Sequence, residues 1–374
     1  MHIYLDNAAS TQVDEEVLKV MNEMQKINFG NPSSIHYFGR NAKALIEKSR
    51  RTVANIFHVS PSEIFFTSGG TEAINLAFFG CVKSLNVKNV ITTKLEHQAV
   101  LQCLKLYEKS NQIKINYLNT DEKGHIDFKQ LVELLENNPR SLVALMHVNN
   151  EISNLLAIKK VSRICRKHDA FFLSDTVQSV GHFKLNLENV NLDFIIGSGH
   201  KFHGPKGVGF IYINNNLNIN SLLIGGAQER NIRAGTENLI GIIGMAKAIE
   251  IAYRDFDKNT EYISELKSYF VKKLKTEFDN IQFLGDSEEK GAYYILNVVY
   301  PKTEKSDLLM INLDIDGIAV SEGSACTSGS SVRSHVVEAL NLEQDKQAIR
   351  FSFSKYNTKE EIDFCIQTLK KYLS

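Results

Sequence analysis

The sequence has no excess of charge of one sign, because 43 lysine and arginine residues balance 43 aspartate and glutamate residues. Proteins that bind nucleic acid broadly carry a basic excess, so nucleic acid is not expected as a partner. Long apolar runs are missing as well. The most apolar stretch, residues 239–251, contains Lys247 and Glu250 and is too short and too polar to cross a bilayer. We therefore expect no membrane partner.

Cysteine is scarce, and no two cysteines form a C-x-x-C pair. The five cysteines are Cys81, Cys103, Cys165, Cys326 and Cys365. An odd number of scattered cysteines argues against a disulfide framework and against a zinc site. The first ten residues also lack the basic and apolar segments of a secretory signal. These absences predict a cytoplasmic protein without a metal of its own.

The order of the expected elements predicts an α/β fold. A helix follows Asp14, with apolar residues spaced by three and four, and residues 60–63 have the pattern of a helix start with a capping box. Short apolar segments then alternate with helical patterns, such as the helix expected over residues 158–168. The expected strands cover residues 64–66, 90–93, 113–118, 142–147, 171–174 and 194–196. Such alternation is typical of a mainly parallel sheet with helices on both faces.

A chain of 374 residues is long for a single core and suits two domains. The pattern changes after Asn238, where a long helical region, roughly residues 239–278, leads into strands and a closing amphipathic helix. The expected strands there cover residues 294–299, 318–320 and 349–353. We therefore expect a large domain over residues 15–255 and a small α+β domain formed by residues 1–14 and 256–374.

The strongest local signal for chemistry is the segment Ser198–Lys201, which follows the strand expected at residues 194–196. A lysine at a strand end, next to glycine and small polar donors, is well placed to form a Schiff base with an aldehyde cofactor. For this segment alone, a surface lysine in a glycine-rich turn is the commoner alternative. Asp175 follows the strand at residues 171–174, at the edge where open parallel sheets bind ligands. Its carboxylate could bond a pyridinium nitrogen, or it could cap a helix.

Three further segments follow expected strands. Residues 67–72, Thr-Ser-Gly-Gly-Thr-Glu, join a strand to a helix whose amide groups and positive end favour a phosphate, although a simple capped turn is commoner. His97 could stack on a flat cofactor ring or relay protons, with a structural histidine as the commoner alternative. Asn149 and Asn150 could bond a ring hydroxyl or a substrate carboxylate.

Cys326 lies in a loop of small polar residues, 321–331. Most free cysteines are buried small hydrophobic residues, whereas nothing apolar surrounds Cys326. A loop thiol in a reducing compartment is better explained as a nucleophile or sulfur carrier, and the other four cysteines are expected to be inert. Arg350 precedes a strand-like segment, and its guanidinium could clamp a carboxylate or form a structural salt bridge.

Together these motifs resemble the cysteine desulfurases of the NifS/IscS type, which are fold-type I pyridoxal-phosphate enzymes. The matching segments are residues 4–9, 29–34, 67–75, 96–97, 148–152, 175–181, 198–209, 230–236, 323–328 and 349–352. The combination of Ser-Gly-His-Lys at 198–201 with Gly-Ser-Ala-Cys-Thr-Ser at 323–328 is specific to this family, whereas no single segment is. The resemblance implies a fold-type I transferase fold, with a seven-stranded sheet in the large domain and a mobile cysteine loop in the small domain.

The resemblance also implies how pyridoxal 5'-phosphate would be held. Lys201 would form the Schiff base, Asp175 would bond the ring nitrogen, and His97 would stack on the ring and take part in catalysis. Asn149 and Gln178 would contact the phenolic oxygen. The phosphate would be bound by Gly70, Thr71, Ser198, His200 and, across the interface of a homodimer, Thr236.

The substrate implied by the resemblance is L-cysteine. Arg350, assisted by Asn149, would hold its carboxylate, and Cys326 would attack its sulfur and become a persulfide. The persulfide would pass to a sulfur acceptor or iron–sulfur scaffold protein, which implies a role in iron–sulfur cluster assembly. Cys326 could also share a cluster transiently with such a scaffold.

Three positions depart from the family pattern. Ser153 stands where the family often has glycine and Leu156 where it has glutamine, and both changes could alter the site. Glu322 lies four residues before Cys326, where small residues are usual, and could raise the pKa of the thiol. These departures leave alternatives open: a selenocysteine lyase or another class V enzyme, and a non-catalytic sulfur-assembly scaffold. A nucleotide-binding protein is a third alternative, although no lysine follows the phosphate-loop candidate at residues 67–71.

Overall fold

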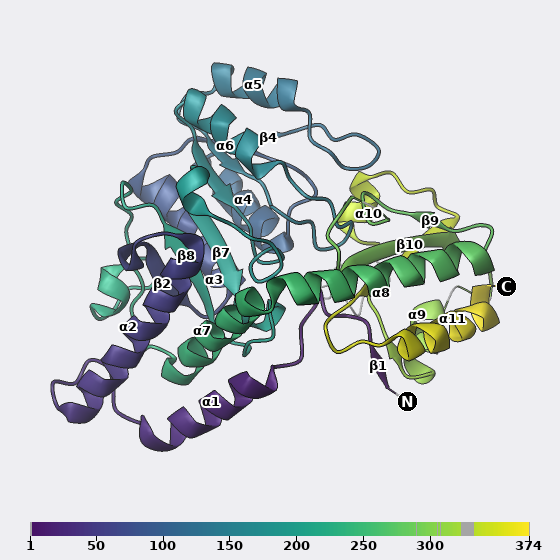
Figure 1. The fold of residues 1–374 in the computed structure, drawn as a ribbon. Helices are drawn as coiled ribbons and strands as arrows, with labels where there is room; N and C mark the ends of the chain where they lie inside the picture. Colours follow the sequence, from purple (N-terminus) through teal and green to yellow (C-terminus); the bar gives the residue numbers. More distant parts are fainter. Residues whose placement is uncertain (1, 289, 305, 307, 323–332, 374) are drawn as a thin grey trace.

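A seven-stranded sheet forms the centre of the structure, a computed structural model that describes residues 2–288, 290–304, 306, 308–322 and 333–373 (Figure 1). Its strands are β2 (Ile64–Thr67), β3 (Asn89–Thr92), β4 (Lys114–Tyr117), β5 (Leu142–Ala144), β6 (Phe171–Ser174), β7 (Phe194–Ser198) and β8 (Gly209–Ile213). Their spatial order is β2-β8-β7-β6-β5-β3-β4, and only β8 runs antiparallel to its neighbours in this sheet. The predicted mainly parallel sheet is confirmed.

Helices cover both faces of this sheet, because its strands are buried and send alternate side chains to opposite sides. These helices are α1 (Glu15–Ile27), α2 (Tyr37–Phe57), α3 (Gly70–Phe79), α4 (Gln98–Lys109), α5 (Phe128–Asn137), α6 (Ile158–Lys167) and α7 (Leu239–Arg254). On β2, Ile64 and Phe66 join the apolar cluster under α2, α6 and α7, whereas Phe65 joins the cluster under α3 and α4. Two apolar layers therefore fix the sheet from both sides.

A smaller part of the molecule joins the start of the chain to its last third. Here β1 (Ile3–Tyr4) pairs in parallel with β11 (Ile318–Ala319), and β10 (Ile295–Pro301) pairs with β9 (Gln282–Phe283) and β12 (Lys346–Ser352) in antiparallel fashion. The helices of this part are α8 (Phe256–Glu277), α9 (Leu309–Ile315), α10 (His335–Ala339) and α11 (Lys359–Leu373). The N- and C-terminal ends lie on this same side of the molecule (Figure 1).

Some elements differ from their predicted form. Residues 60–63 carry the expected capping box, and the helix that it starts is a single 3-10 turn over Pro61–Glu63. The helical region at 239–278 consists of two helices, α7 and α8, separated at Asp255. None of the helices that the structure describes combines the length and the apolar composition needed to cross a bilayer.

Candidate active site

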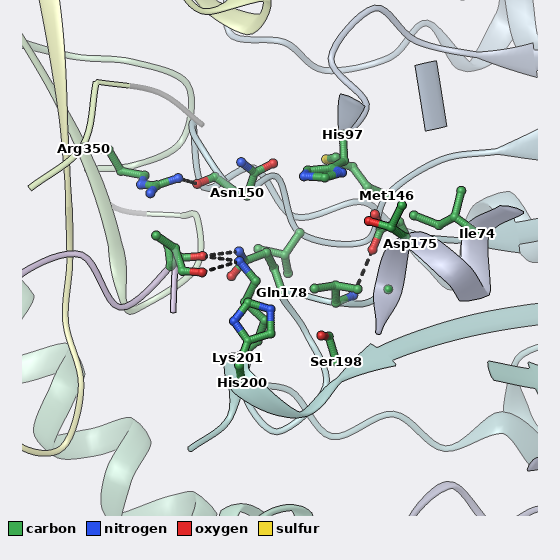
Figure 2. A pocket seen from close by; sticks show the side chains of 16 residues that line it. Ile74, His97, Met146, Asn150, Asp175, Gln178, Ser198, His200, Lys201 and Arg350 are labelled. Atoms are coloured by element: carbon green, nitrogen blue, oxygen red, sulfur yellow. Dashed lines mark hydrogen bonds between the residues drawn. The ribbon is translucent and has the colours of Figure 1, made fainter. Parts of the chain in front are cut away.

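A cavity of about 190 Å³ opens near the carboxyl ends of the parallel strands β5 and β6. Figure 2 shows its labelled side chains converging, with Arg350 and Asn150 on one side and Asp175 and Ile74 on the other. The predicted site residues that line the cavity are Gly70, Thr71, His97, Asp175, Gln178, Ser198, His200, Lys201 and Arg350. Segments between residues 8 and 350 therefore meet at one place, outside the carboxyl ends of strands, where open α/β sheets bind ligands.

Lys201 projects into this cavity from a 3-10 turn, Gly199–Lys201, directly after β7. Its Nζ donates hydrogen bonds to the carbonyl oxygens of Ala8 and Ala9, at 2.7 and 2.9 Å. Glycine is required at position 199, because a Cβ there would lie 2.8 Å from the carbonyl oxygen of Pro205. The amine is thus directed by the backbone of the N-terminal segment.

The start of α3 has the donor groups that suit a phosphate. Its N-cap, Gly69, makes no side-chain cap, so the first amide groups of the helix keep their donors for a ligand. A Cβ on Gly70 would lie 2.9 Å from the Val177 side chain, so only glycine allows α3 to start this close to the segment after β6. Thr71 and Ser198 line the same corner of the cavity.

Asp175 and His97 both line the cavity and interact electrostatically with each other. Asp175 is almost completely buried, and burial raises the pKa of its carboxyl, while His97 and Lys201 oppose this shift. Burial lowers the pKa of His97. The Nδ1 atom of His97 accepts a hydrogen bond from the backbone N–H of Ala99 at 3.1 Å, which leaves Nε2 to carry the ring proton. Burial also lowers the pKa of His200 to about 4, so this imidazole is neutral near pH 7.

Arg350 comes from β12 and is 1% exposed. Its Nη1 donates to the carbonyl oxygen of Asn150 at 2.9 Å, and its Nη2 pairs with the Asp6 carboxylate at 2.8 Å. Its buried Nε has no hydrogen-bond acceptor among the described residues. The guanidinium therefore combines a fixed position with remaining donor capacity, which suits a carboxylate ligand.

The structure places the two asparagines at 149 and 150 differently from the prediction. Asn149 does not line the cavity: its Nδ2 donates to the Leu95 carbonyl oxygen, and its Oδ1 accepts from the N–H groups of Glu151 and Ile152. The neighbouring Asn150 lines the cavity instead. The Asn149 amide is thus engaged in holding the turn, and Asn150 is the asparagine that faces the cavity.

Two predicted residues lie elsewhere. Thr236 is exposed and does not line this chain's cavity, and Cys326 lies outside the described residues. The cysteines that the structure describes are all buried. Burial raises the pKa of each of their thiols, to about 12 for Cys103 and Cys165.

Several residues of the site were not predicted from the sequence. The carbonyl groups of Ala8 and Ala9 and the side chains of Ile74, Met146 and Val177 form part of the cavity. Residues 4–9 were noted as part of a motif, so the signal was present, but a backbone oxygen that directs a lysine leaves no side-chain pattern.

The donor set fits pyridoxal phosphate. An amine, a buried carboxylate and an imidazole line one cavity, and a helix start without a side-chain cap offers amide donors for the phosphate. Glycines at 69 and 70 leave the room that a Cβ would fill, since Ser198 Oγ lies 3.7 Å from such a Cβ at Gly69.

Comparison with known proteins agrees with this geometry. The family model for class-V aminotransferases matches residues 3–364. The chain belongs to this family. It is 40% identical to "Cysteine desulfurase IscS" of Dictyoglomus turgidum over 99% of this chain and 94% of that protein. The predicted family, the fold-type I fold and the pyridoxal-phosphate cofactor of class V enzymes are thereby confirmed.

Two solved structures are similar to this chain over nearly its whole length. One, described as a NifS-like protein, shares 34% identity and a TM-score of 0.91, with 99% of each chain covered. The other, described as SspA in complex with cysteine, shares 28% identity and a TM-score of 0.81, covering 95% of this chain and all of that one.

Proposed function

We propose that this enzyme is a cysteine desulfurase, which converts L-cysteine to L-alanine and carries the removed sulfur as a persulfide on Cys326. The observation that carries the proposal is that one cavity joins Lys201, Asp175 and Arg350. These three residues supply an amine, a carboxylate for a ring nitrogen and a guanidinium for a substrate carboxylate. Similarity to proteins named cysteine desulfurase, and to one described in complex with cysteine, supports the choice of substrate.

Each cavity residue has a separate role in the proposed reaction. When bound, pyridoxal phosphate supplies a ring that withdraws electrons from the substrate Cα. Lys201 would hold that cofactor and, as a free amine, would take the proton from the substrate Cα. Arg350 holds the carboxylate from the opposite side, and Asn150 next to it lines the wall where the phenolic oxygen would lie. His97, whose pKa is lowered by burial, would stack against the ring.

The sulfur step needs no external oxidant or reductant. The Cys326 thiolate attacks the sulfur of the substrate, so that an S–S bond forms and the Cβ–S bond breaks. The electron pair of the broken bond stays with the carbon side, where a proton replaces the sulfur and L-alanine results. The enzyme keeps one sulfur atom as Cys326 persulfide, which a second thiol can accept.

A homodimer is the assembly we propose. Five apolar side chains are exposed in and around the segment between α1 and α2: Ile27, Phe29, Ile35, Tyr37 and Phe38, with exposed fractions from 47% to 90%. Apolar patches of this kind mark interaction surfaces, and an identical copy is the commonest partner. The exposed Thr236 is then available to the phosphate site of that second copy. We propose further that the sulfur goes to an acceptor or iron–sulfur scaffold protein in the cytoplasm.

The substitution Cys326→Ala tests the function directly. The variant should bind the cofactor and L-cysteine and still exchange the Cα hydrogen of L-alanine with deuterium, because these steps need Lys201 and not the thiol. It should release no sulfide and gain no 32-Da sulfur adduct in intact mass measurements. Cys165→Ala, which changes a buried thiol, is the matched control and should retain activity. A Cys326→Ala variant that desulfurates L-cysteine at the wild-type rate would contradict the proposal, and one that processes only selenocysteine would point to a selenocysteine lyase.

A further inference from the structure

The turn at residues 149–153 lines the cofactor cavity with Asn150 and is held from the small part of the molecule. Arg350 of β12 donates to the carbonyl oxygen of Asn150, and Asn297 of β10 donates through Nδ2 to the carbonyl oxygen of Glu151 at 3.1 Å. The N–H of Ala292 donates to the Ser153 carbonyl oxygen at 2.8 Å. The turn is therefore fixed on its backbone from three points, and its position is coupled to β10 and β12.

Glu151 sends its side chain from this turn to Ser334. Glu151 is completely buried, and its Oε2 accepts a hydrogen bond from the Ser334 hydroxyl. The same hydroxyl oxygen accepts from the N–H of Val336 at 3.1 Å, so the hydroxyl proton is available only for Glu151. Ser334 is the N-cap of α10, and its bond with Glu151 thus fixes the point where α10 begins.

His335, the next residue, makes a second attachment. Its Nε2 lies 2.9 Å from the carbonyl oxygen of Glu96, and its Nδ1 lies 2.9 Å from Nε2 of Gln98. Since Gln98 Nε2 can only donate, Nδ1 of His335 accepts and Nε2 carries the proton. Glu96 and Gln98 flank His97, which lines the cavity. The start of α10 is thereby tied to both walls of the cofactor site.

The segment that contains Cys326 lies between Ser321 and Ser334 in the sequence. At its other end, Ser321 and Arg350 exchange backbone hydrogen bonds of 3.2 and 2.8 Å. Arg350 therefore holds Ser321 on one side of the segment, and Glu151 holds Ser334 on the other side. Arg350 also bonds the backbone of Asn150, and Glu151 follows Asn150 in the chain.

We propose that Glu151 is a positioning residue for sulfur transfer, acting through Ser334 to set where the Cys326 segment ends relative to the cofactor cavity. The inference rests on the proposed function. A thiol that attacks the sulfur of a bound substrate needs a near-attack position, and Glu151 links the cavity wall that carries Asn150 to the anchor point of the segment that carries the thiol. Glu151 does not line the cavity, so it should affect the transfer step and not the proton step at Cα.

The test separates these two steps in Glu151→Met, which keeps the volume of the side chain but removes the acceptor for Ser334. In the cofactor-loaded enzyme, persulfide formation at Cys326 in a single turnover with L-cysteine, followed by intact mass, should slow roughly tenfold or more. Deuterium exchange at Cα of L-alanine, followed by NMR, should stay within about twofold. Glu151→Gln keeps an acceptor oxygen and should recover most of the persulfide rate. Glu338→Met, the same change at an exposed site on α10, is the matched control and should leave both rates unchanged.

Ser334→Ala removes the hydroxyl that donates to Glu151, and it provides the same test if Glu151→Met folds poorly. It should slow persulfide formation as Glu151→Met does, and the double variant should be no slower than the slower single variant, because both changes remove one interaction. Equal losses in both rates, or no loss in either, would overturn the inference. Wild-type enzyme that forms no persulfide at Cys326 would overturn the proposed function itself, whereas normal persulfide formation in Glu151→Met would overturn only this inference.

Discussion

Asp175 is the single residue on which the proposed electron withdrawal depends most directly. It lies at the end of β6, it is nearly completely buried, and one of its oxygens accepts from the N–H of Val177 at 3.0 Å. Burial alone favours the protonated carboxyl, whereas His97 and Lys201 favour the carboxylate. A protonated ring nitrogen beside it would add the strongest partner for the negative charge.

Replacing Asp175 with asparagine should therefore slow the proton step at Cα. A charge-assisted hydrogen bond contributes roughly 1.5–3 kcal/mol, and each ~1.4 kcal/mol corresponds to a factor of ten, so we expect a loss of about ten- to a hundredfold. Deuterium exchange into L-alanine measures the step. Asp169→Asn, at an exposed position after α6, should exchange at the wild-type rate. Exchange at the wild-type rate in Asp175→Asn would contradict the proposed role of this carboxylate.

Ser153 shows how a departure from the family pattern is accommodated. Its φ of +68° lies in the left-handed region that favours glycine, and its Oγ donates to the carbonyl oxygen of Ala292 at 3.2 Å. The strain and the hydrogen bond are each of order 1 kcal/mol and offset one another. Ser153→Gly should consequently change the free energy of unfolding by less than about 1 kcal/mol, whereas Ser153→Val should destabilise by about 2 kcal/mol or more, because a β-branched residue tolerates this φ poorly. Urea unfolding of the cofactor-loaded enzyme measures both, and equal stabilities for the two variants would refute the explanation.

At the scale of the residue, the sequence indicates which side chains follow a strand, but it does not distinguish two neighbouring asparagines. Asp175 and Lys201 follow β6 and β7, Arg350 lies within β12, and all three line one cavity. Asn149 and Asn150 could not be told apart, because the direction of each amide depends on the turn that Asn149 itself stabilises. The predicted roles of Thr236 and Cys326 stay predictions.

Among the elements, α2, β2 and the turn at 228–231 are joined by one buried ion pair. Arg50 of α2 forms two hydrogen bonds with the carboxylate of Glu229, at 2.7 and 2.8 Å, and donates to the carbonyl oxygen of Ile64. Glu229 also accepts from the N–H of Phe66 at 2.7 Å. The residues from Glu229 to Asn231 have positive φ, so this pair stabilises a strained turn that leads to the exposed Thr236.

Arg50→Met should leave the Glu229 carboxylate buried without its charge partner and destabilise the enzyme by about 3–5 kcal/mol. The double variant Arg50→Met/Glu229→Met should recover a large part of that loss, because no unpaired charge then remains. Arg51→Met, an exposed neighbour on the same helix, is the control and should have little effect. Urea unfolding provides the comparison, and a double variant no more stable than Arg50→Met would contradict the argument.

The missed elements have physical explanations. No helix was predicted over residues 37–57, because Ser49 and Arg50 lie on the buried face of α2 and interrupt its apolar pattern. Strand β8 was also missed: it follows β7 after only a short loop and pairs with it in antiparallel fashion, which the alternation of strands and helices does not indicate. The boundary at residue 255 stays a prediction, supported by the apolar cluster that gathers residues 263–369 with Ile3, Leu5 and Ala8.

At the scale of the whole molecule, the proposed homodimer makes each active site depend on two copies of the chain. Lys201→Ala disables a subunit's own site, and Thr236→Glu places a negative charge against the phosphate of the partner's cofactor. In a mixture of the two variants, half of the dimers are mixed, and each mixed dimer has one site with an intact Lys201 and an intact Thr236. Subunits refolded together should recover about a quarter of the wild-type activity. Sedimentation of the wild-type enzyme as an active monomer would contradict the proposal.

The pairing of β1 with β11, and of Asp6 with Arg350, also has a consequence for biosynthesis. The carbonyl groups that direct Lys201 belong to residues 8 and 9, yet the strands that support this segment end at residue 352. At about 5–20 residues per second, a ribosome needs roughly 20–70 s to travel from one to the other. During that time the seven-stranded sheet can form on the nascent chain while the lysine that would hold the cofactor still lacks its acceptors. A partly synthesised chain would therefore expose a cofactor site that is not yet assembled, and competence to bind the aldehyde would arrive only after residue 352 has been made.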